Sequence, residues 1–229
     1  MESTSFSRGA ALSVDEALHI LENPTRRRIL ERLAKESHYP LQLSRELRVS
    51  QQAVVKHLRV LEEGRLVESH EEPSDVGGPP RRVYAARRGL SVTIDVGPSL
   101  FRTEIRPLEP PSSGKRGFGQ FEDALDRVSE TDDIRRRVRM AAELVERLNR
   151  EVESLEEKRS RLVAMKDRAL ALAHAGAERL FSRYDQRSVL YTLLDEGVRA
   201  ASELAARLDV RESLIAEVLR RLSAEKILR

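Results

Sequence analysis

A short stretch of the chain, residues 50–59, combines side-chain types that read DNA base edges with types that hold phosphates. A glutamine amide can pair with the edge of adenine, an arginine with guanine, and a valine can touch the methyl group of thymine. No acidic residue occurs between Gln51 and Val60, whereas a solvated helix face without a partner more usually carries acids. The pattern therefore favours contact with double-stranded DNA over such a face. The predicted DNA-binding residues of this stretch are Ser50, Gln51, Gln52, Val55, Lys56 and Arg59.

Three helices are predicted to position this stretch. Asn23-Pro24 places a cap before a proline at the first helical position, and apolar residues at helical spacing then predict a helix over residues 24–35. A short second helix follows, and Ser50 caps a third helix that begins at Gln51 and ends near Glu62. The last two helices share one apolar side, which is typical of a helix-turn-helix. The residues predicted to point inward are Leu43, Leu47, Val49, Ala53, Val54, Leu58 and Leu61.

A strand hairpin with a long tip is expected after the third helix. Residues 66–70 and 82–86 are short extended candidates, and turn-forming residues fill the stretch between them. Arg81 and Arg82 lie at the start of the second strand, where they could reach the DNA backbone or an adjacent minor groove. We therefore predict that both arginines bind DNA. Residues 90–96 alternate apolar and polar side chains, which predicts a third strand.

A long helix with a heptad pattern is expected in the middle of the chain. A winged helix-turn-helix domain is predicted over residues 12–106 and a linker rich in proline and glycine over 107–131. Within residues 132–184, apolar residues step by four and three with valine at position a, which favours two-stranded parallel coils. The alternative is an amphipathic helix folded against its own domain, and the direction of pairing is left open. The predicted dimerisation residues are Ile134, Val138, Val145, Leu148, Val152, Leu155 and Leu162.

The last segment, residues 185–229, repeats the first helical unit. Apolar positions of the last two helices and the residue after them correspond one to one at a displacement of 161 residues, and those of the first helix correspond at a displacement of 160. The segment is therefore predicted to be a second unit that resembles a helix-turn-helix. Leu43, Leu47, Val49, Val54, Leu58, Leu61 and Leu66 correspond to Leu204, Leu208, Val210, Ile215, Leu219, Leu222 and Ile227.

The two repeats differ in charge. The second contains eight basic and eight acidic residues, whereas residues 24–65 contain ten basic and five acidic ones. Glu212 and Glu217 take the places of a glutamine and a lysine, and these acids would face phosphates if their helix docked in a groove. We expect this unit to pack against a partner subunit or another protein. The alternative is a second DNA reader that uses Arg220 and Arg221.

Composition narrows the remaining possibilities. Charged residues make up 34% of the chain and aromatic residues only 4%, which predicts a mainly α protein with a small β-wing. The chain has no cysteine and its five histidines are dispersed, so no metal site is predicted. It has no phosphate-binding loop, nucleophile elbow or zinc-protease motif, so we predict no catalytic residue, no cofactor and no enzyme. It also has no apolar run long enough for a membrane span, and we expect a cytoplasmic protein.

Two segments resemble the ArsR-type winged helix-turn-helix transcription regulators: Asn23-Pro-Thr-Arg-Arg-Arg-Ile-Leu-Glu-Arg-Leu and Leu43-Ser-Arg-Glu-Leu-Arg-Val-Ser-Gln-Gln-Ala-Val-Val-Lys-His-Leu-Arg. The resemblance covers residues 15–100. The layout of the whole chain is similar to archaeal two-domain members of the sulfur-response type. The resemblance implies a dimer that places the third helix, with the residues named above, in the major groove. Sensing members of the family carry cysteine motifs that this chain lacks, so the effector is unknown.

The leading hypothesis is a sequence-specific regulator of transcription that binds double-stranded DNA as a homodimer. The first alternative is a nucleoid-type architectural protein that coats DNA with little sequence preference. The second is a protein-interaction adaptor, because winged helices and coiled coils also assemble complexes.

Overall fold

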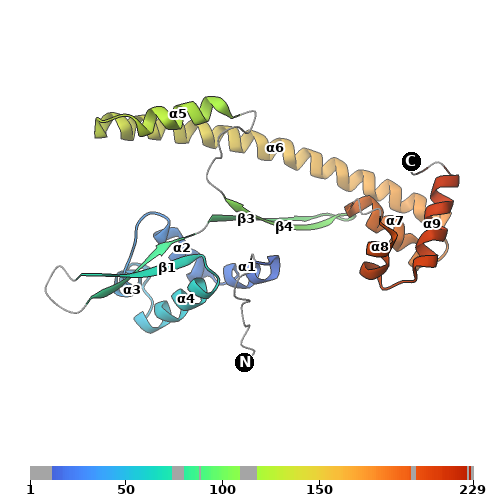
Figure 1. Ribbon diagram of the computed structural model, residues 1–229, viewed down its shortest axis with the longest axis horizontal. Helices are drawn as coiled ribbons and strands as arrows, with labels where there is room; N and C mark the ends of the chain where they lie inside the picture. The colour runs from blue at the N-terminus through green and yellow to red at the C-terminus, as the bar shows by residue number, and fades with distance from the viewer. Residues whose placement is uncertain are drawn as a thin grey trace. The chain divides into compact units, whose positions relative to one another are not determined.

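The computed structural model describes residues 12–73, 80–87, 89–108, 118–196, 200–225 and 227. Contacts divide the chain into two compact units (Figure 1). The N-terminal unit comprises Met1–Ile94 and Thr103–Gly114, and the C-terminal unit comprises Asp95–Arg102 and Lys115–Arg229.

The N-terminal unit contains a cluster of short helices followed by strands. Its described helices are α1 (Val14–Leu21), α2 (Pro24–Leu33), α3 (Pro40–Leu47) and α4 (Gln51–Glu63). They are followed by β1 (Val67–Glu72) and β2 (Arg81–Ala86), and then by β3 (Gly89–Val96) and β4 (Phe101–Leu108), whose connected ends, Asp95–Arg102, belong to the C-terminal unit. The predicted helix, helix, helix and hairpin order is confirmed.

One hydrophobic core holds α1 to α4 and the first hairpin together. Apolar residues recur every three or four positions along each helix, so each helix has one side to bury. Removing a leucine or isoleucine side chain of this size from water stabilises the fold by about 1.5–3 kcal/mol. The buried residues of this core are Ile20, Ile29, Leu33, Leu43, Leu47, Val54, Leu58, Leu61, Leu66, Val67 and Tyr84.

The strands form two separate two-stranded sheets. β1 and β2 pair antiparallel from Val67 opposite Ala86 to Glu72 opposite Arg81, and we call this pair the wing. The predicted third strand is confirmed as β3, but it pairs with β4 and not with the wing. β4 was not predicted, because arginines and a proline dilute its weak alternation of apolar residues.

The turn between β3 and β4 is part of the C-terminal unit, where polar contacts hold it against the long helix over residues 134–180. The backbone N–H of Ser99 donates a hydrogen bond to Asp167 Oδ1 at 2.8 Å, and Asp95 forms an ion pair with Arg159. A Cβ atom on Gly97 would lie only 2.5 Å from Asp167 Oδ1, so glycine is needed for this close approach.

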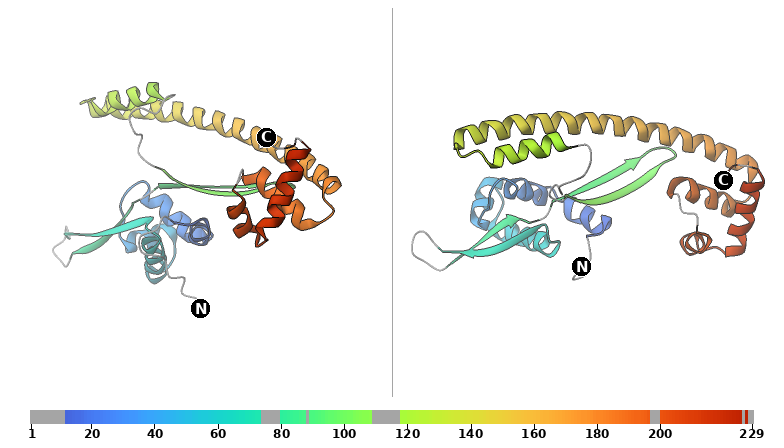
Figure 2. Two further views of the ribbon diagram at one scale, coloured as in Figure 1. Left: turned by 45° about the vertical axis from the view of Figure 1, so that its right-hand side comes forward. Right: turned by 45° about the horizontal axis from the view of Figure 1, so that its top comes forward.

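The C-terminal unit is built around one very long helix. Its helices are α5 (Gly119–Ser129), α6 (Ile134–Leu180), α7 (Tyr184–Glu196), α8 (Ala201–Leu208) and α9 (Glu212–Ala224). Figure 2 shows α5 alongside the first half of α6, with α7, α8 and α9 gathered at the opposite end of α6. The predicted long helix is confirmed.

Helix α5 corrects the prediction of a linker over residues 107–131. β4 extends to Leu108, and residues 119–129 are helical. The glycine- and proline-rich composition ends before this helix, and Phe121 and Ala124 are spaced to bury one side of it. The remainder of the predicted linker between β4 and residue 118 lies outside the described residues.

The predicted dimerisation residues of α6 divide into two groups. Leu148 packs within the chain, where it joins the cluster of Phe121, Ala124 and Leu144 between α5 and α6. Leu148 is therefore half-buried by α5, which was not anticipated, and its role in dimerisation stays a prediction. The other six predicted residues are exposed to solvent in the chain: Ile134, Val138, Val145, Val152, Leu155 and Leu162.

Helices α7, α8 and α9 surround a second core. α8 and α9 have the lengths of α3 and α4 and begin 161 residues after them. The turns match as well, because Arg48 after α3 and Asp209 after α8 both adopt the left-handed conformation, with φ of 56° and 51°. The buried residues of this core are Ala177, Phe181, Val189, Leu190, Leu193, Leu204, Ile215, Val218 and Leu222.

Candidate nucleic-acid interface

Helix α4 is positioned by its cap and by three buried residues. The Ser50 hydroxyl accepts a hydrogen bond from the backbone N–H of Ala53 at 3.2 Å, which starts the helix at Gln51. Val54, Leu58 and Leu61 are completely buried, at spacings of four and three. These contacts fix which side of the helix faces outward.

The outward side of α4 holds the predicted base-reading residues. Gln51, Gln52, Lys56 and Arg59 are exposed, and Val55 is half-buried beside them. None of them is packed beneath another segment, so the side chains are accessible to a ligand. The structure thus brings these residues together on one surface, while their contact with DNA stays a prediction.

The turn between α3 and α4 sets the angle between the two helices. Arg48 adopts the left-handed conformation, and the next backbone N–H, of Val49, donates to the carbonyl of Ser44 at 3.2 Å. The Ser44 hydroxyl donates to the carbonyl of Val49 at 2.8 Å. Side chain and backbone of Ser44 therefore close this turn from both directions.

The wing presents its two predicted arginines differently. Arg82 binds Glu62, with its Nη2 3.1 Å from Oε1, and its Nε donates to the Ser69 hydroxyl at 2.8 Å. The Arg81 guanidinium lies 5.6 Å from the centre of the Tyr39 ring, where it can make a cation–π contact. Arg81 is therefore the more available of the two for a phosphate.

The wing is less basic than its arginines alone suggest. β1 supplies Glu68, Glu71 and Glu72, and two of these acids lie directly opposite Arg82 and Arg81 in the strand register. The prediction that Arg81 and Arg82 bind DNA considered the charges of the second strand only, and it did not include the acids of the first strand. Since opposite charges across a strand pair partly cancel, the net attraction of the wing for phosphate is reduced.

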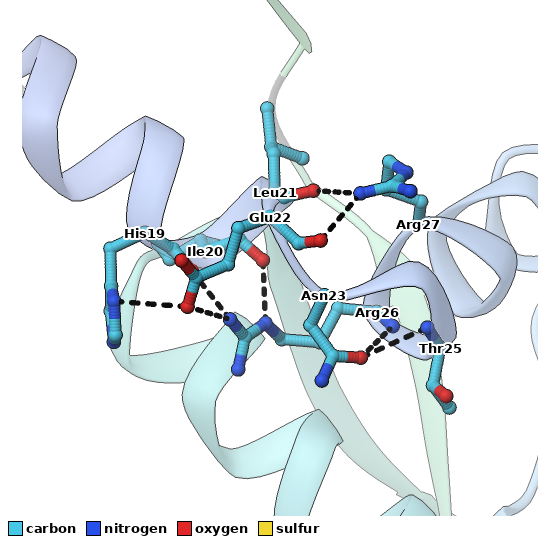
Figure 3. Close-up of polar contacts among 8 residues, drawn as sticks. All are labelled: His19, Ile20, Leu21, Glu22, Asn23, Thr25, Arg26 and Arg27. Carbon is cyan, nitrogen blue, oxygen red and sulfur yellow. Dashed lines mark hydrogen bonds and ion pairs between the residues drawn. The ribbon is translucent and has the colours of Figure 1, made fainter.

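The arginines at the start of α2 have a structural role that the sequence did not reveal. Arg26 is buried, and it donates to the carbonyls of Ile20 and His19 at the end of α1 (Figure 3). Arg27 donates to the carbonyls of Leu21 and Glu22. Both residues satisfy backbone acceptors that the end of a helix leaves open. Each arginine lies five to seven residues after its acceptors in the sequence.

His57 lies on α4 between the core and the outward side. Burial lowers the pKa of its imidazole, and the positive charges of Arg26 and Lys56 lower it further. The ring is therefore neutral at pH 7 and adds no charge to the surface.

The described residues contain no cluster of three or more histidines and acids arranged to hold a metal ion. The helices of the described chain also include none that is long and apolar enough to cross a membrane.

Comparison with known proteins agrees with this geometry. Residues 21–70 match the model of a helix-turn-helix domain family, and they extend from the end of α1 into β1. This part of the chain is a helix-turn-helix domain, a class of fold that indicates DNA binding and a role in transcription regulation. No curated protein matches the chain.

Proposed function

We propose that this protein is a sequence-specific transcription regulator, of the ArsR type, that binds double-stranded DNA as a homodimer. In this proposal α4 enters the major groove and the wing contacts the backbone or an adjacent minor groove. One observation carries it: from Gln51 to Val60 the outward side of α4 is exposed and free of acids, and its opposite side is fully buried.

Base reading would come from the first two turns of α4. Gln51 and Gln52 follow the Ser50 cap, so they lie at the end of the helix that enters a groove first in this class of fold. Lys56 and Arg59 lie one and two turns further on, where they can reach phosphates or guanine. The amino end of the helix also attracts phosphate through its dipole.

The dimer would be formed by α6. Six apolar residues of its predicted seam are exposed within the chain, and such a stripe is typical of a helix that pairs with another. A two-fold dimer places two copies of α4 on half-sites that are one helical turn, about 10 base pairs, or a multiple of it apart.

The unit of α7, α8 and α9 would bind a protein surface and not DNA. Its α9 begins with Glu212, and an acid at the amino end of a helix competes with a phosphate for the same dipole. Glu217 accepts a hydrogen bond from Gln186 at 3.1 Å and adds a second negative charge to the helix. Both features support a structural or subunit-binding role for this repeat.

The experiment that tests the proposal compares Gln52→Ala with Arg81→Ala on an operator selected from random DNA. Loss of one base contact should weaken binding to this operator about 5- to 150-fold and leave binding to unrelated DNA unchanged. Arg81→Ala should weaken binding to the operator and to unrelated DNA by the same factor. It should also reduce the slope of log affinity against log salt concentration by about one. Binding isotherms at several salt concentrations measure both effects.

The matched control is Ser213→Ala, because Ser213 occupies in α9 the place of Gln52 in α4. It should leave the affinity for the operator unchanged. If Gln52→Ala weakens binding to all sequences equally, and footprints spread with concentration, base reading is refuted and the architectural alternative holds.

A further inference from the structure

The exposed apolar residues of α6 form a continuous stripe only in the first half of the helix. We call Ile134, Val138, Val145, Val152 and Leu155 the α6 stripe. Their side chains are 73%, 63%, 53%, 57% and 42% exposed, although they recur at the four- and three-residue steps of a heptad seam. A stripe of this kind exposes enough apolar surface to require a partner.

The same face of α6 is occupied by the chain itself beyond Leu155. Arg159 and Lys166 are the next two residues at position a of the heptad. Arg159 forms an ion pair with Asp95 in the β3–β4 turn, and Lys166 Nζ lies 2.8 Å from Asp195 Oδ1 of α7. The two basic residues that interrupt the heptad thus bind segments of the same unit. Leu162, which lies between them, is exposed, but the two intrachain ion pairs leave residues 134–155 as the only uninterrupted apolar part of the seam in the described part of α6.

The charges flanking the stripe have opposite signs at its two ends. At the heptad positions e and g, which flank the seam, the amino end carries Arg135 and Arg137, and the carboxyl end carries Glu151 and Glu156 followed by Lys158. A parallel pair in register would place like charges side by side at both ends. An antiparallel pair would place each basic end beside an acidic end.

We propose that the α6 stripes of two copies of this chain pair antiparallel. This inference rests on the homodimer proposed above and assigns its geometry. In the register that best opposes the charges, Val138 lies against Leu155 of the second copy, and Val145 lies against Leu148. The two-fold axis then passes between residues 146 and 147.

Helix composition alone would point to the parallel arrangement. Valine at position a favours parallel pairs when leucine or isoleucine fills every position d. In α6, Ala141 occupies one position d, and α5 covers part of Leu148 at the next. The seam therefore lacks the regular layers on which that preference depends, and the flanking charges decide the direction.

The absence of cysteine from the sequence allows a direct test with single cysteines in the full-length chain. Val138→Cys and Leu155→Cys are purified separately, mixed after unfolding and refolding together, and oxidised. Antiparallel pairing predicts a disulfide between the two variants, at a yield at least about ten times that of either variant alone, because only this mixture brings two cysteines within bonding distance. Val138→Cys alone should not cross-link, since its two copies would lie about 25 Å apart along the helices.

The matched control is Arg150→Cys, which is exposed on the side of α6 away from the stripe and should cross-link in no mixture. Sedimentation and operator binding of each reduced variant check that fold and dimer are intact. Efficient cross-linking of Val138→Cys with itself would overturn the antiparallel arrangement and leave the homodimer standing. A dimer in which none of these cysteines cross-links would show that the stripe is not the interface. An unmodified chain that binds its operator as a monomer would overturn the homodimer itself.

Discussion

The helices α2, α3 and α4 and the helices α7, α8 and α9 share their inward residues and differ in their outward ones. Leu43, Leu61 and their counterparts Leu204 and Leu222 are all completely buried. The backbone hydrogen bonds of the turns correspond too, since Val210 donates to Ala205 at the 3.2 Å found in the first unit. The inward residues therefore specify the same three helices twice, whereas the outward residues give the two units surfaces of different charge.

The clearest difference lies at the amino ends of α4 and α9. Ser50 caps α4 through its hydroxyl, and the first turn has no acid. Arg211 occupies the cap position of α9 without a side-chain hydrogen bond, and Glu212 follows it. Because the helix dipole favours negative charge at this end, the acid in the first turn of α9 disfavours a phosphate there, and the first turn of α4 carries no such acid.

A second difference concerns one pair of equivalent buried residues. Arg26 and Gln186 are both 8% exposed and lie 160 positions apart. Arg26 holds the carbonyl end of α1, whereas Gln186 donates to Glu217 on α9. The neighbouring arginines correspond, since Arg27 donates to carbonyls at the end of α1 and Arg187 to carbonyls at the end of α6. The position of Arg26 thus contacts the preceding helix in one unit and an outward acid in the other.

The largest expected effect on stability comes from substitutions in the two hydrophobic cores, which affect the two units separately. Leu61→Ala and Leu222→Ala each remove a completely buried side chain and should lower the free energy of unfolding of their own unit by about 2–5 kcal/mol. Hydrogen exchange measured by mass spectrometry locates each effect. Only Leu61→Ala should also weaken operator binding, because only its unit carries the proposed interface. An equal loss of binding from Leu222→Ala would place the second unit in the DNA complex.

The next largest effect is expected when the outward charged residues of α4 and α9 are exchanged. Gln51→Glu combined with Lys56→Glu gives α4 the acids of α9 and should lower operator affinity at least about 100-fold, because two contacts are lost and phosphates are repelled. The reciprocal pair, Glu212→Gln with Glu217→Lys, should leave affinity within about twofold, given the proposed protein-binding role of α9. Fluorescence anisotropy with labelled operator measures both. A gain of affinity in the reciprocal pair would favour the second-reader alternative.

Regular sequence patterns predicted most of the helices and the wing. The helices α2, α3, α4 and α6 and the wing were anticipated from apolar spacing, caps and turn residues. α1, α5 and β4 were not, because α1 and α5 each bury only two residues and the apolar alternation of β4 is diluted by arginines and a proline. The outward residues of α4 follow from the helical period, whereas the engagement of Arg82 with Glu62 and of Arg26 with α1 depends on tertiary positions that no local pattern encodes.

The smallest effect concerns pH and again contrasts equivalent positions. His57 on α4 corresponds to Val218 on α9, which is completely buried. Burial, with the nearby charges of Arg26 and Lys56, lowers the pKa of His57 in the folded chain below its ordinary value of 6.5. The folded state therefore binds a proton less readily than the unfolded state does. The stability that neutral His57 contributes is complete above about pH 6.5 and declines as the pH falls through the lowered value.

His57→Val should remove this decline from the N-terminal unit, and urea unfolding from pH 5 to pH 8 measures the difference between variant and parent. Exposed His19, which is also on the N-terminal unit, serves as the control: His19→Gln should leave the decline in place. A parent chain whose advantage over His57→Val grows as the pH falls would show that protonated His57 is instead stabilised by the fold.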